Sequence, residues 1–162
     1  MSVEAKVANI IRRKKAQYVR YIDTKQWSKF EELALADAEL SFHNSDGSVM
    51  TLSGTAFQFS SVKSFTAYFS KFFAQAQTLH MVGHGELERI GAGEVRAIWG
   101  MEDQIMLPLF AEIRGGGYYH ETWVLKNGGW FLKSLRLERT YMKYNFVATL
   151  GSWLQSTGVP VV

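Results

Sequence analysis

The C-terminal half of the chain consists of long segments in which apolar and polar residues alternate. This alternation predicts four antiparallel strands, at Leu79–Ile90, Glu94–Leu107, about Gly117–Lys126 and Trp130–Lys143. The predicted connections are Gly91–Gly93, Pro108–Gly116 and Asn127–Gly129. Glycines within the strands, at Gly83, Gly85 and Gly100, predict bulges, and bulges curve a sheet. We therefore expect the chain to be built around one long, strongly curved sheet.

The N-terminal segment has the periodicity of a helix. Apolar residues recur every three or four positions from Val3 to Ile22, which predicts an amphipathic helix. Tyr18 falls on the apolar side, so we expect it to face inward. The basic cluster Arg12–Lys15 falls largely on the opposite side, and we interpret it as a solvated face rather than a nucleic-acid-binding surface.

Two further helices and two extended segments follow. Asp23 suits the N-cap of a short second helix, which would bury Trp27, Phe30, Leu33 and Ala34. A third helix is predicted to start at residue 61 or 62 and to end at Gln77, because aromatic residues recur there at helical spacing. Between these helices, Glu39–His43 alternates like a strand and Val49–Phe59 is predicted to be extended.

Helices that precede a long antiparallel meander indicate an α+β fold, with the helices covering one face of the sheet. A curved, mixed or antiparallel sheet covered by three helices forms a cone, and such a cone encloses a pocket suited to a small apolar molecule. The 162 residues contain no Pro- or Ser-rich linker, so we expect a single domain with its core at about 3–146. The tail at 147–162 is expected either to cover the pocket mouth or to pack on a partner subunit of a homodimer.

Composition excludes several classes of function. A chain without cysteine has no disulfide, zinc–thiolate site or thiol nucleophile. The histidines and acids lack the spacing of a metal site, and Gly115–Gly117 lacks the lysine of a phosphate-binding loop. No apolar run is long enough to span a membrane and no secretory signal is visible, so we expect a cytoplasmic protein that binds neither membrane nor nucleic acid. The 11 Phe, 7 Tyr and 5 Trp predict an aromatic pocket for a small molecule. We expect the protein to act on that molecule without a metal ion or an organic cofactor.

Four segments carry a recognisable pattern: QYVRYIDTKQW, TLHMVGH, AIWGMEDQIM and LERTYMKYNF. In this order they resemble the SnoaL-like branch of the nuclear transport factor two fold, and within it the scytalone dehydratase and bile acid 7α-dehydratase type of enzyme. The resemblance covers most of the chain up to about Phe146. It implies catalytic roles for Tyr18, Asp23 and His80, a pocket aspartate at Asp103 and a pocket arginine at Arg139.

These residue types suit acid–base chemistry. Dehydration or double-bond isomerisation beside a carbonyl needs a base, an acid and hydrogen-bond donors for a developing enolate. His80 suits the role of base because an unperturbed imidazole titrates near physiological pH. A carboxylate, either Asp103 or Asp23, is expected to hold its second ring nitrogen.

The remaining candidates would contact the substrate. Tyr18 and Tyr119 are expected to donate hydrogen bonds to substrate oxygens. Arg139 would stabilise negative charge or hold a carboxylate in place. Trp99 shares a face with Asp103 at a period of two residues, so we expect it to line the same pocket.

Two strand registers stay open. In the first predicted strand, a bulge at Gly83 would leave either His80 or His84 facing inward. In the predicted strand at about Gly117–Lys126, Tyr118 and His120 share one face and Tyr119 lies on the other. Either face could be the concave side of the sheet. All of these residues are therefore candidates for the pocket wall.

We expect a lyase or isomerase of the dehydratase, isomerase or cyclase type. It would act by acid–base chemistry on a hydroxylated, apolar polycyclic or polyketide-like molecule of secondary metabolism. Two alternatives stay open. The same fold hosts non-catalytic binding or interaction modules, since a fold alone does not determine function. Epoxide or ester hydrolysis would need Asp23 and Asp103 on opposite walls with an arginine between them.

Overall fold

The computed structural model describes residues 1–145 and 147–149, so all but the first three residues of the predicted tail lie outside the described part. The helices are α1 (Ala5–Asp23), α2 (Trp27–Glu31) and α3 (Val62–Phe72), with a short 3-10 helix at Pro108–Phe110. The strands are β1 (Ala34–His43), β2 (Thr51–Leu52), β3 (Thr55–Ala56), β4 (Gln58–Phe59), β5 (Gln77–Gly91), β6 (Glu94–Met106), β7 (Glu112–Lys126) and β8 (Gly129–Tyr144). None of the described helices is long and apolar enough to cross a membrane.

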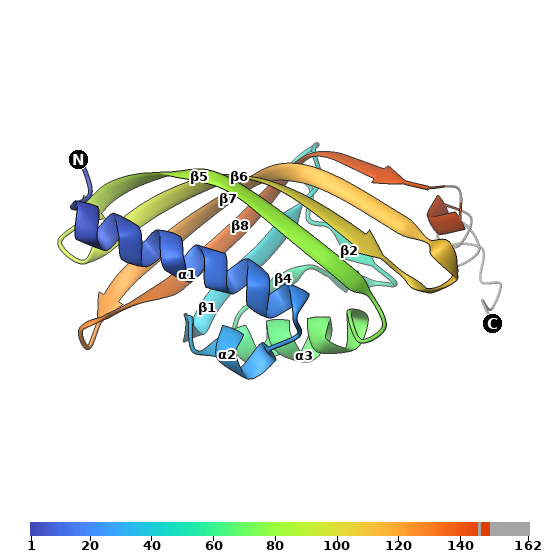
Figure 1. The fold of residues 1–162 in the computed structure, drawn as a ribbon, viewed down its shortest axis with the longest axis horizontal. Coiled ribbons are helices and arrows are strands. Elements are labelled where there is room, and N and C mark those ends of the chain that lie inside the picture. Colours follow the sequence, from blue (N-terminus) through green and yellow to red (C-terminus); the bar gives the residue numbers. More distant parts are fainter. Residues whose placement is uncertain (146, 150–162) are drawn as a thin grey trace.

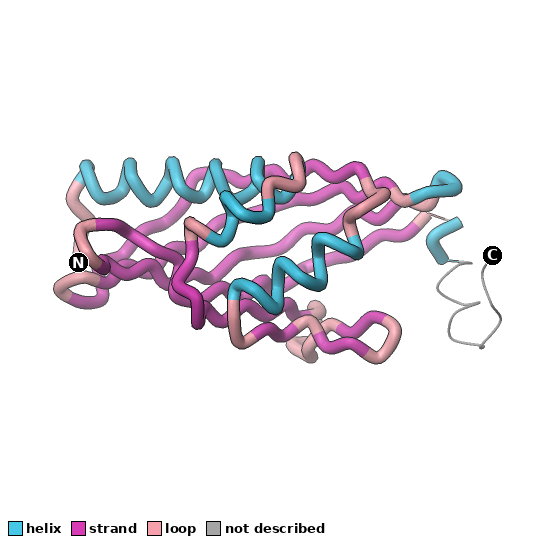
Figure 2. Tube along the Cα trace, turned by 90° about the horizontal axis from the view of Figure 1, so that it is seen from below, coloured by secondary structure: helices cyan, strands magenta, loops and turns pink. Residues whose placement is uncertain are grey.

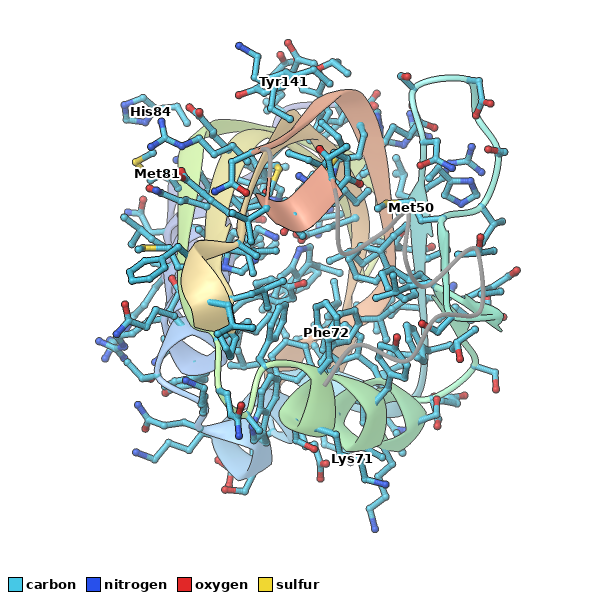
Figure 3. All side chains as sticks on the ribbon, turned by 90° about the vertical axis from the view of Figure 1, so that its right-hand side faces the viewer. Met50, Lys71, Phe72, Met81, His84 and Tyr141 are labelled. Carbon is cyan, nitrogen blue, oxygen red and sulfur yellow. The ribbon has the colours of Figure 1, made fainter. Side chains whose placement is uncertain are left out.

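Six strands form one mixed sheet in the order β4-β1-β8-β7-β6-β5, and β2 pairs with β3 separately. β1 runs parallel to β8, while the other neighbours are antiparallel. The sheet is open because β4 and β5 form its two edges. The helices lie on one side of the long curved strands (Figures 1 and 2). Viewed from one end, the sheet arches over α3, which confirms the predicted α+β cone (Figure 3).

Two of the predicted helices are shorter than expected. The second helix ends at Glu31, and Ala34, which was predicted to belong to it, already starts β1. The third helix begins after Ser61, whose hydroxyl caps it by accepting a hydrogen bond from the Ser64 amide, but it ends at Phe72. Gln77, its predicted last residue, pairs with Met106 in the sheet. Strand pairing therefore overrides the helical periodicity at both places.

The predicted connection Pro108–Gly116 is largely strand. β7 begins at Glu112, and Gly115 and Gly116 pair with both β6 and β8. A Cβ atom on Gly115 would lie 2.6 Å from Nη1 of Arg139, and one on Gly116 would lie 2.5 Å from the Tyr141 ring. The glycines therefore give larger side chains on β8 room to lie across β7.

The first helix buries a stripe that includes a charged residue. Ile11, Lys15, Tyr18 and Ile22 are all buried, at intervals of four, three and four residues. Arg12 and Arg13 are exposed, as expected for the basic cluster. Lys15 has no exposed surface, so the prediction of a solvated face is wrong for this residue. Its partners belong to the functional site described below.

The glycines that predicted bulges lie at one irregularity of the sheet. The β5–β6 register shifts between Val82 and Gly85, as the glycines there predicted. Gly100 lies opposite this shift, between Trp99 and Met101, while the β6–β7 register stays continuous where Gly100 pairs with Tyr118. Gly85 has a steric role as well, because its face is covered by the ring of Trp99.

Replacing Gly85 by Ala is expected to lower the free energy of unfolding by about 1–3 kcal/mol. The added Cβ would lie 2.2 Å from the buried Trp99 ring, which would have to move. Urea unfolding of the two proteins measures the difference. Gly83→Ala is the matched control, since its Cβ would come no closer than 3.7 Å to another residue. Equal losses for the two variants would contradict the steric explanation.

Candidate active site

A cavity of about 130 Å³ lies under the arch of the sheet. Its apolar wall comes mainly from α3, β1 and the segment around β2, and includes Phe42, Phe57, Phe65, Phe69, Phe72 and Met50. In Figure 3, Phe72 of α3 and Met50 project toward the interior, while Lys71 points away from it. Its polar side chains include Tyr18, His80, Asp103, Tyr119 and Arg139, which come from α1, β5, β6, β7 and β8. The cavity therefore has an apolar wall and a wall of titratable groups.

The His80 ring is held by a carboxylate from the end of α1. Nδ1 of His80 lies 2.7 Å from Oδ1 of Asp23, and the His80 backbone amide donates to Oδ2 at 2.9 Å. The Thr78 hydroxyl donates to Oδ1 at 2.8 Å. Because a carboxylate accepts at Nδ1, that nitrogen carries the proton and Nε2 is left with its lone pair. The imidazole is thus fixed in the tautomer that a general base requires.

Asp23 is not the cap of the second helix. It is the last residue of α1, and α2 begins four residues later at Trp27. Its carboxylate instead reaches β5, where α1 packs on the sheet. The sequence left open whether Asp23 or Asp103 holds His80, and the hydrogen bonds assign this contact to Asp23.

Asp103 and Arg139 form a buried bidentate ion pair. Arg139 donates from Nη1 to Oδ1 at 3.0 Å and from Nη2 to Oδ2 at 2.6 Å. Burial acts to lower the pKa of Arg139, but the hydrogen bonds and the negative charge of Asp103 outweigh burial and raise it. Both Asp103 oxygens are occupied as acceptors, so this residue does not suit the role of acid. Oδ2 lies 3.9 Å from Nε2 of His80, where it would stabilise a protonated ring.

Tyr18 and Tyr119 lie together beside this pair. Both are almost fully buried, and their rings meet edge to face with centroids 5.9 Å apart. Burial, with a further contribution from nearby acidic groups, raises the pKa of both hydroxyls. Both therefore remain protonated at physiological pH and can act as neutral hydrogen-bond donors.

Three predicted pocket residues lie outside the arch. The bulge in β5 leaves His84 exposed on the outer side, where it appears with Met81 and Tyr141 in Figure 3. Tyr118 is 49% exposed, and His120 lies 3.5 Å from Glu138 on the same outer face. None of these three lines the cavity, so of the two open registers the structure places His80 and Tyr119 at the pocket. The inward face of β7 is the one that carries Tyr119.

Trp99 faces inward but does not line the cavity. Its indole Nε1 donates to Oε2 of Glu121 at 2.7 Å, and Nε1 of Trp123 donates to the same oxygen at 2.9 Å. Oε1 of Glu121 lies 2.5 Å from Nζ of Lys15. All four side chains are buried, so they form a polar cluster inside the core.

Sequence reasoning missed Lys15 and Glu121, although signals for both were present. Lys15 falls four residues after Ile11 and three before Tyr18, within the buried stripe of α1. Glu121 shares its face with Tyr119 and Trp123 at a period of two residues. Thr78, which binds Asp23, carried no comparable signal.

The described residues also bear on metal binding and on the epoxide or ester hydrolase alternative. Among them, no three His, Asp or Glu side chains lie close enough together to hold a metal ion. His80, rather than an arginine, lies between Asp23 and Asp103. This arrangement differs from the one that the hydrolase alternative required.

Comparison with known proteins gives matches along most of the chain. The sequence model of a family described as the SnoaL-like domain matches residues 4–136. A Gibberella zeae protein named "Probable cyclase FGR4" is 40% identical over 146 residues, which cover 88% of this chain and 97% of that protein.

Solved structures share the fold at low sequence identity. A candidate scytalone dehydratase from Novosphingobium aromaticivorans has a TM-score of 0.71 at 14% identity, over 83% of this chain and 85% of that one. A hexachlorocyclohexane dehydrochlorinase, LinA-type3 from Novosphingobium barchaimii, has a TM-score of 0.70 at 14% identity, over 85% and 89% of the two chains. At this level of identity, the likeness extends to the fold alone.

Proposed function

Since the chain belongs to the SnoaL-like domain family, we propose that it is a cofactor-independent lyase or isomerase of the dehydratase or cyclase type. The observation that carries the proposal is the His80–Asp23 pair, whose free ring nitrogen lies at a cavity that also holds two tyrosines and an ion-paired arginine. A base, a charge-stabilising group and neutral donors are the components that proton abstraction beside a carbonyl requires.

The proton would move to Nε2 of His80. The Asp23 carboxylate holds the opposite nitrogen and would stabilise the imidazolium that forms. The C–H electron pair would pass into the carbonyl of the substrate, where Tyr18 or Tyr119 donates to the developing enolate oxygen. The imidazolium can then return its proton to the leaving hydroxyl, so that water departs, or to another carbon, so that a double bond moves.

The cavity wall favours a substrate that is mainly apolar. Phenylalanines from α3 and β1 supply much of the wall away from the polar groups, and planar or polycyclic molecules pack well on aromatic rings. The similarity to a protein named as a probable cyclase is consistent with a substrate that contains or forms a ring. We therefore infer a hydroxylated, carbonyl-bearing aromatic or polycyclic substrate from secondary metabolism.

The non-catalytic alternative explains less of this geometry. A binding module needs complementary shape and a few orienting polar groups. It does not need an imidazole oriented by a carboxylate that is itself held by two further hydrogen bonds, from the Thr78 hydroxyl and the His80 amide. The hydrogen-bonded pair is therefore the feature that favours catalysis over binding alone.

The proposal can be tested with 5-nitrobenzisoxazole, a flat apolar probe of base catalysis. A base removes the C3 proton, the N–O bond breaks, and the electron pair leaves on a phenolate oxygen as a nitrile forms. The coloured phenolate is followed by absorbance. We expect saturable turnover by the parent protein that exceeds the rate with free imidazole at the same concentration.

Removing the donors should slow this reaction. Tyr18→Phe and Tyr119→Phe are each expected to lower kcat about tenfold, with little change in KM, because the donors act on charge that develops in the transition state. Tyr141→Phe is the matched control, since Tyr141 lies on the outer side of the sheet. Binding of the probe without turnover above that of free imidazole would overturn the proposal in favour of a binding module.

A further inference from the structure

A buried ammonium group lies directly behind the two cavity tyrosines. Nζ of Lys15 is 4.0 Å from the centroid of the Tyr18 ring and 3.6 Å from that of the Tyr119 ring. Lys15 does not line the cavity, whereas both tyrosines do. The two rings therefore lie between the cation and the space in which a substrate would bind.

The ammonium has a partner for each of its hydrogens. One partner is Oε1 of Glu121 at 2.5 Å, and the other two are the ring faces of Tyr18 and Tyr119. Glu121 is fixed in turn, because Oε2 accepts from the indoles of Trp99 and Trp123. The cation is thus held at one point, with both tyrosine rings packed against it.

Stability alone is a weak explanation for such a cluster. Removing two charges from water is unfavourable, and replacing a buried ion pair by uncharged groups of similar size is often neutral or stabilising. Burial lowers the pKa of Lys15, while the charge of Glu121 and its hydrogen bond oppose that effect. The Glu121 carboxylate thereby favours the charged ammonium, and it is the charge that attracts the ring faces.

We propose that Lys15, fixed by Glu121, is a positioning residue that holds the hydroxyls of Tyr18 and Tyr119 toward the substrate oxygen. This inference rests on the proposed acid–base function, in which those hydroxyls are the donors. Effective donors must already be aimed at the developing charge, since reorientation during the reaction would reduce their effect. A cation in contact with both rings limits the tilt and displacement of each ring, and so of its hydroxyl oxygen, without occupying any of the cavity.

The test uses the paired change Lys15→Met with Glu121→Gln, which removes both charges at once. Met reproduces the lysine side chain as far as Cε, and the Gln carbonyl can still accept from Trp99 and Trp123. With 5-nitrobenzisoxazole, we expect kcat to fall by about tenfold to a hundredfold, because small misplacements of catalytic groups have effects of this size. KM should change little, since no residue that lines the cavity is altered.

A double-mutant comparison separates positioning from a general structural effect. In a background that carries Tyr18→Phe and Tyr119→Phe, the paired change should cause no further loss of kcat, because there are no hydroxyls left to position. The same fold loss in both backgrounds would overturn the proposal, since it would show that the cluster acts independently of the tyrosine hydroxyls.

A second readout does not depend on turnover. In protein labelled with 3-fluorotyrosine, ¹⁹F line shapes report ring flips, with Tyr18 and Tyr119 assigned from their Phe variants. We expect the paired change to accelerate the flips of these two rings about tenfold and to leave Tyr141 unchanged, as expected when a desolvated cation–π contact is lost. If the parent lacked turnover but the flips accelerated, the proposed function would fail while the restraint on the rings stood. Unchanged flips would overturn the positioning role, whatever the turnover.

Discussion

With 5-nitrobenzisoxazole as substrate, His80→Gln is expected to lower kcat by about 10²–10⁴-fold, the usual contribution of a general base. Gln keeps polar atoms in the site but provides no base. A variant rate close to that of the parent would contradict the assignment of His80 as the base.

Asp23→Asn should approach the same loss. An amide in place of the carboxylate can donate to Nδ1, which would place the ring proton on Nε2 and remove the lone pair from the cavity. Because His80 and Asp23 act as one unit, the double variant should be little slower than either single variant. Multiplicative losses would contradict the proposed pairing.

The matched control for these variants is His84→Gln. His84 is on the same strand, but the β5 bulge places it outside the arch. Its replacement is expected to leave kcat and KM unchanged. A loss at His84 comparable with that at His80 would mean that the base had been assigned to the wrong histidine.

The contrast between these two histidines shows what the sequence could predict. Alternation along Leu79–Ile90 identified a strand, and Gly83 and Gly85 identified a bulge, so the fold and its curvature were predictable. The direction of each side chain after the bulge depends on pairing with β6, where His80 lies opposite Asp103 and Gly85 opposite Trp99. That register is set by long-range packing, which a single-sequence pattern does not contain.

The two faces of β7 illustrate the same dependence. Both carried aromatic and titratable residues, so period-two alternation separated Tyr118 from Tyr119 without indicating which one faces inward. The glycines before them determine the outcome in the structure, because Gly115 leaves space for the Arg139 guanidinium on the inner side. Arg139 can then reach Asp103 across the intervening strand.

Charged residues in the core were the least predictable feature. A lysine within a run of four basic residues has the composition of a solvated face, and burial of a lone lysine is unfavourable. Lys15 is buried because its partner, Glu121, is supplied by a strand more than a hundred residues away. In the structure Lys15 lies on the buried stripe of α1, and it is the tertiary fold that provides the carboxylate that makes its burial possible.

The same pairing predicts a large loss of stability when it is broken on one side. Lys15→Met alone is expected to lower the free energy of unfolding by about 3–5 kcal/mol, because it leaves the Glu121 carboxylate buried without a counter-charge. Adding Glu121→Gln should restore most of that loss, since the paired variant buries no uncompensated charge. Urea unfolding at neutral pH, monitored by tryptophan fluorescence, measures all three proteins.

Lys14→Met is the neighbouring control. Lys14 is half-buried, with Nζ 5.1 Å from the centroid of the Phe131 ring, and no ion pair with a described residue is found for it. Its replacement should change the free energy of unfolding by less than about 1 kcal/mol. If Lys15→Met were no more destabilising than Lys14→Met, or if adding Glu121→Gln gave no recovery, the two charges would not be coupled in the folded protein. The coupling matters beyond stability, because the arrangement proposed for Tyr18 and Tyr119 requires the cation to stay charged, and within residues 1–145 its counter-charge is the Glu121 carboxylate.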